Sequence, residues 1–299
     1  MLRFTLLIVV GVLWGSQYVF IKMALVDLTP SALTFFRLGL GTVFMALACL
    51  MIPRPSPPPD QQQPAPRSPW WLIAIIGILE AGLPALLIAW GEQWIESSLA
   101  AILLGTTPLF TIVLSCLVLK QERFRAGLII AVIVGFIGLL VLFGFRMQMD
   151  APLHGMAGLA ILVAALCFAT SLVLLARVKG RAPQTVARDL MFWASLALLP
   201  VWLIWGEPSS TTMTATTAIV ILYLATLGSG AVFLIYVQLI RLAGATFASL
   251  SNYLVPIVGV ALGVSLGEET LMTSDLVALL IILGALAAAN PAAFRRRPA

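Results

Sequence analysis

The sequence predicts an all-α polytopic membrane protein, with ten transmembrane helices arranged as a 5+5 inverted repeat around a central cavity. Of its 299 residues, 61% are hydrophobic and 10% are charged, and the mean hydropathy is +1.08. Soluble domains contain only about 45–50% apolar residues. The chain contains ten long apolar stretches, and one segment occurs twice with different charges at its end. These observations predict the fold class.

The ten apolar stretches are long enough to cross a membrane, because a bilayer core needs about 20 apolar residues per helix. Each stretch is continuously apolar, whereas the strands of a membrane barrel alternate. We therefore expect helices over residues 4–25, 31–52, 70–90, 98–119, 127–145, 156–176, 190–206, 215–240, 246–266 and 275–294.

The first stretch is interpreted as a retained helix and not as a signal peptide. It contains polar Gln17 and Lys22 and has no small-residue cleavage pattern. The three cysteines, Cys49, Cys116 and Cys167, lie within expected spans, so neither a disulfide framework nor a metal site is predicted.

The distribution of basic residues predicts the orientation. If the N-terminus is cytoplasmic, 14 of the 17 basic residues fall in cytoplasmic loops or tails, with Arg146 in an outer loop and Lys22 and Arg37 within spans. The positive-inside rule then places both termini in the cytoplasm, in a cell inner (plasma) membrane. The net charge of +5 is explained by membrane insertion and indicates no nucleic-acid partner.

The repeated segment indicates two inverted halves. "PLFTIVLSCLVLKQERFRAGL" begins at Pro108 and "PIVGVALGVSLGEETLMTSDL" begins at Pro256, 148 residues later. Both run from a proline through apolar residues to acidic residues, but the second copy lacks the basic ones. Five spans separate equivalent points, and an odd number inverts the second copy. The expected halves are residues 1–150 and 151–299.

Residues 53–69, "PRPSPPPDQQQPAPRSP", contain eight prolines and no apolar run. We interpret this segment as an extended cytoplasmic linker between the second and third spans. A binding site for a proline-recognising partner is the alternative.

Several segments resemble the drug/metabolite transporter superfamily, EamA type: "LWGSQYVFIK", "FFRL", "SSLAAILLGTTPLFTIVLSCLVLKQER" and "SLSNYLVPIVGVALGVSLGEE". The chain is also similar in length and expected spans to YddG-type amino acid exporters. The resemblance implies a basket of ten helices whose cavity is lined by spans 1, 3, 4, 6, 8 and 9. One departure is that Glu122 lies fourteen residues after Pro108, whereas Glu269 lies thirteen after Pro256.

Glu80 lies near the middle of the third span, where an ionised carboxylate costs roughly 2.5–3.5 kcal/mol or more. It is a candidate for binding a substrate ammonium group or for proton coupling. The alternative is a hydrogen-bonded contact between helices.

Pro108 and Pro256 are candidate hinges. Each removes a backbone donor and frees the carbonyl four residues earlier, at Leu104 or Asn252. Ordinary helix prolines are the alternative, because membrane helices tolerate them.

The other candidate cavity residues are polar or aromatic side chains within spans, for which helix contact or core packing is the alternative. They are Trp14, Gln17, Tyr18, Thr107, Ser229, Ser251, Asn252 and Tyr253. Lys22 and Arg37 match basic positions of the family and are candidates for a gate or charge network. Snorkelling to the membrane interface is the simpler alternative for both.

The function predicted is secondary transport, with no enzymatic activity, cofactor or metal. No phosphate-binding GxxxxGK[ST] loop occurs, and the only histidine, His154, is expected in an outer loop. The expected substrates are small neutral, zwitterionic or amphipathic metabolites, above all amino acids including aromatic ones, exported by alternating access. A multidrug or lipophilic-cation exporter and a channel remain alternatives. The expected partners are the small-molecule substrate and the lipid bilayer, with a monomer expected and an oligomer left open.

Overall fold

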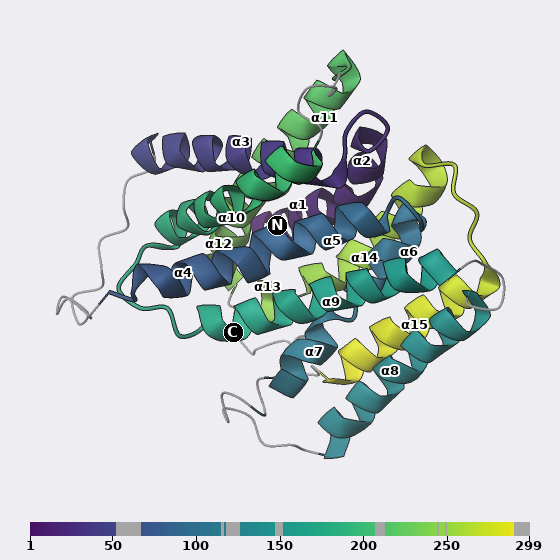
Figure 1. Cartoon of the computed structure of the whole chain (residues 1–299). Helices are drawn as coiled ribbons and strands as arrows, with labels where there is room; N and C mark the ends of the chain where they lie inside the picture. Colours follow the sequence, from purple (N-terminus) through teal and green to yellow (C-terminus); the bar gives the residue numbers. More distant parts are fainter. Residues whose placement is uncertain are drawn as a thin grey trace.

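The computed structural model describes residues 1–51, 67–114, 117, 126–146, 152–206, 213–243, 245–248 and 250–289. The structured elements among them are all helices (Figure 1). Most of the proline-rich linker, Glu122 and the C-terminal arginines lie outside the described residues.

The helices follow the order of the expected spans. In the first half they are α1 (Leu2–Gly15), α2 (Gln17–Ala24), α3 (Pro30–Met51), α4 (Trp70–Gly77), the π-helix η2 (Ile78–Gly82), α5 (Leu83–Gly91), α6 (Ser97–Leu104), α7 (Thr107–Leu114) and α8 (Ala126–Arg146). In the second half they are α9 (Pro152–Leu175), α10 (Pro183–Trp205), α11 (Ala215–Ala225), the π-helix η4 (Thr226–Ala231), α12 (Val232–Ala243), α13 (Ala245–Ala248), α14 (Ser251–Leu266) and α15 (Thr273–Ala289).

Seven helical runs within the described residues are long and apolar enough to cross a membrane. They are Leu2–Ala24, Pro30–Met51, Trp70–Gly91, Ser97–Leu114, Leu153–Leu175, Pro183–Trp205 and Ala215–Leu239, and shorter apolar helices cover Ser251–Leu266 and Thr273–Ala285. The prediction of an all-α, multi-pass membrane fold is thereby confirmed. The arrangement of ten spans as a 5+5 repeat stays a prediction.

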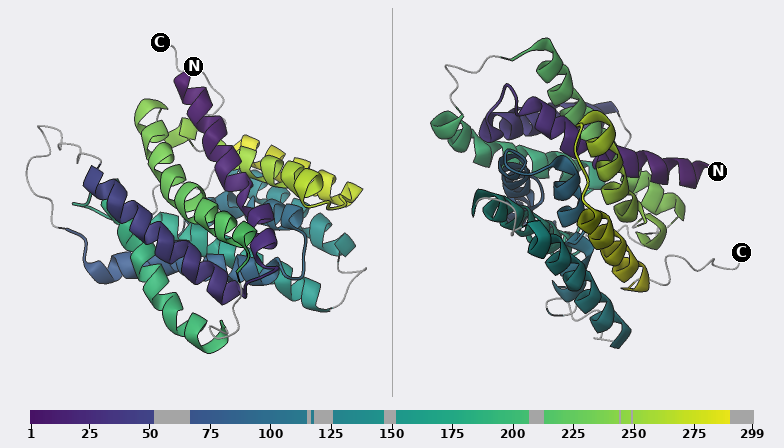
Figure 2. Two further views of the ribbon diagram at one scale, coloured as in Figure 1. Left: turned by 90° about the horizontal axis from the view of Figure 1, so that it is seen from above. Right: turned by 90° about the vertical axis from the view of Figure 1, so that its right-hand side faces the viewer.

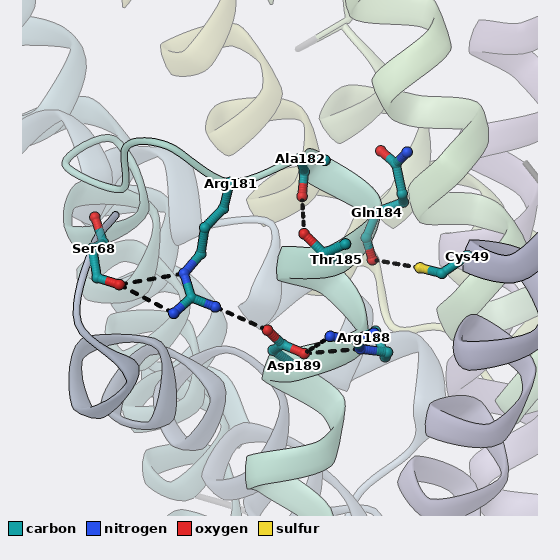
Figure 3. Close-up of polar contacts among 8 residues, drawn as sticks. All are labelled: Cys49, Ser68, Arg181, Ala182, Gln184, Thr185, Arg188 and Asp189. Atoms are coloured by element: carbon teal, nitrogen blue, oxygen red, sulfur yellow. Dashed lines mark hydrogen bonds and ion pairs between the residues drawn. The ribbon is translucent and has the colours of Figure 1, made fainter. Parts of the chain in front are cut away.

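Helix α10 begins earlier than the sequence predicted, at Pro183 instead of residue 190. The polar residues of its first turns are satisfied locally, because Asp189 accepts from Arg188 at 2.6 Å and from Arg181 at 3.1 Å (Figure 3). Arg181 also donates to the carbonyl of Ser68 at 3.1 Å, so the segment that leads into α4 is tied to the start of α10. Hydropathy alone placed the start of this helix after the charged residues Arg188 and Asp189.

Two π-helices lie at matching positions of the two halves. The segment η2 starts at Ile78 and η4 starts at Thr226, which is the offset of 148 residues that also separates Pro108 from Pro256. Single-turn π segments are rare and are frequent at functional sites. Glu80 and Ser229 therefore lie on backbone that departs from the regular α-helix in the same way.

The two halves pack closely through glycines of α1, and helices distant in sequence, such as α8 with α15 and α3 with α10, lie side by side (Figures 1 and 2). A Cβ added at Gly15 would lie 2.6 Å from the Cβ of Val258 and 2.8 Å from the carbonyl oxygen of Val255. Such distances leave no room for a side chain. The polar break that follows Gly15 is therefore held directly against α14.

Candidate functional site

The first span is interrupted at Ser16, between α1 and α2. The buried Ser16 hydroxyl donates to the carbonyl of Leu13 at 3.2 Å and lies 2.6 Å from the hydroxyl of Tyr223 on α11. The interruption thus joins polar groups of both halves inside the membrane-spanning region.

Arg37 contacts two other predicted residues and forms one cluster with them beside this interruption. It is the eighth residue of the 22-residue helix α3. Its Nε donates to Oγ of Ser229 on η4 at 3.1 Å, and its Nη2 donates to Oε1 of Gln17 at the start of α2. The guanidinium therefore points toward η4 and the start of α2. We call Arg37, Gln17 and Ser229 the guanidinium cluster.

Glu80 lies in η2 and accepts a hydrogen bond from Ser171 of α9, a residue that the sequence analysis did not select. Tyr236 of α12 is close enough to interact electrostatically with Glu80. The ring of Tyr236 in turn lies 5.0 Å from the ring of Trp14, centroid to centroid. Glu80, Ser171, Tyr236 and Trp14 form a second group, here called the carboxylate cluster.

The two prolines behave differently. The fourth span is broken at Gly105 and Thr106, just before Pro108, and the carbonyl of Leu104 accepts from the Thr107 hydroxyl at 2.8 Å. The acceptor that Pro108 leaves free is therefore satisfied within its own span, across the break between α6 and α7. Pro256 instead lies inside the continuous helix α14.

The remaining predicted residues lie at the start of α14 or on α2. Ser251 is buried and donates to the carbonyl of Ala248 at 2.8 Å, while Asn252 and Tyr253 are partly buried in the first turn of α14. Tyr18 of α2 lies against α14 at Gly259, where an added Cβ would be 3.3 Å from its ring. Their role as cavity residues stays a prediction.

A buried carboxylate from the second half caps the first helix turn of α6. Glu269 accepts from the backbone N–H of Ser97 at 2.7 Å, from its hydroxyl at 2.7 Å, and from the backbone N–H of Ser98 at 2.9 Å. Lys22 lies 3.6 Å from Glu269 and donates to the carbonyl of Ile95 at 2.9 Å. We call Lys22, Ser97, Ser98 and Glu269 the Glu269 clasp.

The charge of Glu269 is favoured by this arrangement. Burial acts to raise the pKa of Glu269, but the hydrogen bonds from Ser98 and Ser97 outweigh it and hold the pKa below its usual value. Anions at a helix N-terminus are stabilised by the free N–H groups and the helix dipole. The clasp therefore joins the two halves through an ionised carboxylate.

Asp27 is a second carboxylate that accepts hydrogen bonds at the start of a helix, here α11. Its Oδ2 accepts from the backbone N–H of Thr214 at 3.0 Å and from the hydroxyls of Thr214 and Thr217, each at 2.6 Å. These hydrogen bonds lower the pKa of Asp27. Lys22 and Arg37 have their hydrogen-bond partners in the clasp and in the guanidinium cluster.

Glu92 is a buried acid that the sequence analysis missed. It follows directly after the span Trp70–Gly91, its residue is 1% exposed, and neither carboxylate oxygen has a hydrogen-bond partner within the described residues. Burial raises its pKa well above the usual value, with a smaller opposing effect from Lys22. Its position between two tryptophans, Trp90 and Trp94, was the available sequence signal of an apolar setting.

Within the described residues, no group of three His, Cys, Asp or Glu side chains could hold a metal ion. What the clusters can do is bind charge: a guanidinium suits a carboxylate, and a carboxylate suits an ammonium group.

Long apolar helices that enclose buried charged side chains from both halves define a multi-pass membrane transporter. The chain belongs to the EamA-like transporter family, whose family model matches residues 2–144 and 155–290.

Two relatives illustrate the match. The chain is 26% identical over 274 residues to "Uncharacterized inner membrane transporter YedA" of Escherichia coli (strain K12), covering 91% of this chain and 85% of the relative. It is 27% identical over 219 residues to "Protein PecM" of Dickeya dadantii, covering 72% of each. The apolar helices and the first relative support a multi-pass inner-membrane protein.

A solved crystal structure aligns with a TM-score of 0.64 at 20% identity, covering 98% of this chain and 99% of that one. At this identity the likeness shows the fold alone.

Proposed function

We propose that the chain is a secondary transporter that exports small zwitterionic or amphipathic metabolites, in particular amino acids including aromatic ones, by alternating access. The observation that carries this proposal is the pair of charged groups within the spans, Arg37 on α3 and Glu80 on η2, two elements that contact each other. Their hydrogen-bond partners described above are neutral side chains, Gln17, Ser229 and Ser171.

A free amino acid offers one carboxylate and one ammonium group. Arg37 would bind the carboxylate through its fixed fork of N–H donors, and Glu80 would bind the ammonium group. The paired rings of Trp14 and Tyr236 beside Glu80 supply an apolar surface for the substrate side chain. Nucleotide sugars and phosphorylated metabolites carry several negative charges and would require more basic groups than Arg37 alone.

We further propose that residues 1–150 and 151–299 form two inverted repeats of five spans each. The family model matches twice, and both the prolines and the π-helices recur at an offset of 148 residues. Inverted repeats allow two near-equivalent packings, so that access to one site near the midplane changes sides. The break before Pro108 and the continuous helix through Pro256 would exchange in the other state.

The test is uptake of labelled amino acids into proteoliposomes by the parent and by Arg37→Gln and Glu80→Gln. Removing one partner of a buried charge-assisted pair costs about 2–5 kcal/mol, so each variant should weaken half-saturation by at least about 30-fold. Glu268→Gln, which changes an exposed acid, serves as the control.

The same variants distinguish amino acid export from the export of lipophilic cations. The carboxylate cluster and its two aromatic rings favour this second candidate. A cation needs Glu80 but not Arg37. Transport of aromatic cations that survives Arg37→Gln, together with no amino acid transport by the parent, would replace the amino acid proposal. Unchanged amino acid transport in Arg37→Gln would refute the zwitterion site.

A further inference from the structure

We propose that Glu92 is a proton-binding site that controls the Glu269 clasp, which closes when Glu92 carries a proton and loosens when the proton is lost. This inference extends the alternating-access cycle proposed above, but its test requires no substrate.

The first step of the argument is the burial of Glu92. Its carboxyl group is enclosed in the turn between α5 and α6, and neither oxygen has a hydrogen-bond partner within the described residues. An ionised carboxylate in such a place costs several kcal/mol unless a partner satisfies it. The arrangement seen is therefore that of the neutral, protonated acid.

The second step is the set of charges around Glu92. Tyr18 and Lys22 come from α2, Arg37 comes from α3, and Glu269 comes from the loop after α14. The start of α9, which packs against α5, carries His154. Lys22 is bonded to the carbonyl of Ile95 and pairs with Glu269, and Arg37 is bonded to Gln17 and Ser229, so the nearby cations already have partners.

The third step is competition for Lys22. When Glu92 loses its proton, the new carboxylate attracts Lys22 and repels Glu269. Both effects act against the clasp, because Lys22 belongs to it and Glu269 is its central acceptor. The ionised acid is satisfied only if Lys22 turns toward it or if the turn opens to water. Protonation of Glu92 from water thus favours the closed clasp.

The pH dependence follows by linkage. An open, hydrated Glu92 has the ordinary pKa of about 4.3, whereas burial in the closed state raises it. The closed state therefore binds the proton more tightly, and its stability falls as the pH rises between these two values. The open fraction should rise by up to about tenfold per pH unit over this interval and level off above it.

The experiment uses Ser98→Cys as a reporter in the full chain, with the three native cysteines replaced by alanine. The Ser98 hydroxyl is buried without a hydrogen-bond partner within the described residues, and the backbone N–H that donates to Glu269 is retained in the variant. A pyridyl disulfide, which modifies thiols in acid as well, is added to purified protein over a pH series. The rate reports the fraction of molecules with an open clasp.

Each rate is divided by that of Glu92→Gln at the same pH, which removes the intrinsic pH dependence of the thiol. The expected result is a ratio near one in acid that rises at least tenfold toward alkaline pH. Glu92→Leu, a second neutral side chain of similar volume, should follow Glu92→Gln, and Glu268→Gln should follow the parent.

Infrared difference spectra give an independent readout, because the carbonyl stretch of a protonated carboxyl group should be present in the parent and absent in Glu92→Gln. A ratio that stays constant with pH, or a spectrum unchanged by Glu92→Gln, would overturn the inference. Absent amino acid transport with a pH-dependent ratio would refute the proposed function and leave this inference standing.

Discussion

Replacing Glu269 by glutamine tests the clasp most sharply. The amide keeps the shape of the side chain but removes its charge, and one of its two polar ends becomes a donor that faces the N–H groups of α6. A hydrogen bond to a charged group contributes about 1.5–3 kcal/mol, and its neutral counterpart about half of that. Glu269 accepts three such bonds, from Ser97 twice and from Ser98 once.

Losing one bond outright and halving the other two should shift the closed state by about 3–6 kcal/mol. Every 1.4 kcal/mol is a factor of ten, so the Ser98→Cys reporter should react at least about 100-fold faster in Glu269→Gln at neutral pH. The pair with Lys22 adds little to this shift, because the Lys22 side chain is 40% exposed and solvent screens such pairs. Glu268→Gln is the matched control, since Glu268 is the exposed neighbour of Glu269.

The pH dependence that Glu269 gives to the clasp is opposite in sign to that of Glu92. Because the pKa of Glu269 is lowered in the closed state, its stabilisation is complete above the ordinary glutamate pKa and is lost as the pH falls through the lowered value. The parent should therefore open again in strong acid, and Glu269→Gln should lack this acid limb. A rate within threefold of the Glu268→Gln control, or an acid limb retained in Glu269→Gln, would refute the reasoning.

Two further predictions concern packing and capping. Gly15→Ala should lower the melting temperature by several degrees, because the new methyl group would overlap Val258 and overpacking costs about 1–3 kcal/mol; Gly284→Ala, where a Cβ meets nothing within 4 Å, should not, and equal shifts would contradict the account. Asp27→Ala should destabilise the chain at neutral pH by removing the acceptor of three hydrogen bonds from Thr214 and Thr217, and the loss should shrink as the pH falls through the lowered pKa of Asp27. Melting curves at neutral pH and at about pH 3 check this, and a pH-independent loss would count against it.

The fold was predictable from the sequence because a lipid environment dictates long continuous apolar helices. Each expected span overlaps a helix of the described residues. Hydropathy missed the start of α10, where Asp189 pairs with Arg188 and Arg181 within the same turns. It also missed the π-helices, because a π segment is set by packing against neighbouring helices and leaves no sequence period.

The site was predictable only in part, because sequence indicates which residues are costly to bury but not which ones meet. Arg37 and Ser229 are 192 positions apart and were assigned different roles, a gate and a cavity, yet they share a hydrogen bond. Ser171 is an ordinary helix residue until Glu80 is placed beside it. Glu92 follows the end of a span, where an acid normally faces water, and only its 1% exposure in the folded chain shows the burial.

The central claim, that one buried site faces the two sides of the membrane in turn, is tested most directly by counterflow. Proteoliposomes loaded with a high concentration of unlabelled amino acid are diluted into a trace of the labelled compound. A carrier of the proposed kind should concentrate the label inside transiently, well above the outside level, and Arg37→Gln should abolish this overshoot. Label that only equilibrates through a steady leak, with no overshoot for any amino acid or aromatic cation, would contradict the account.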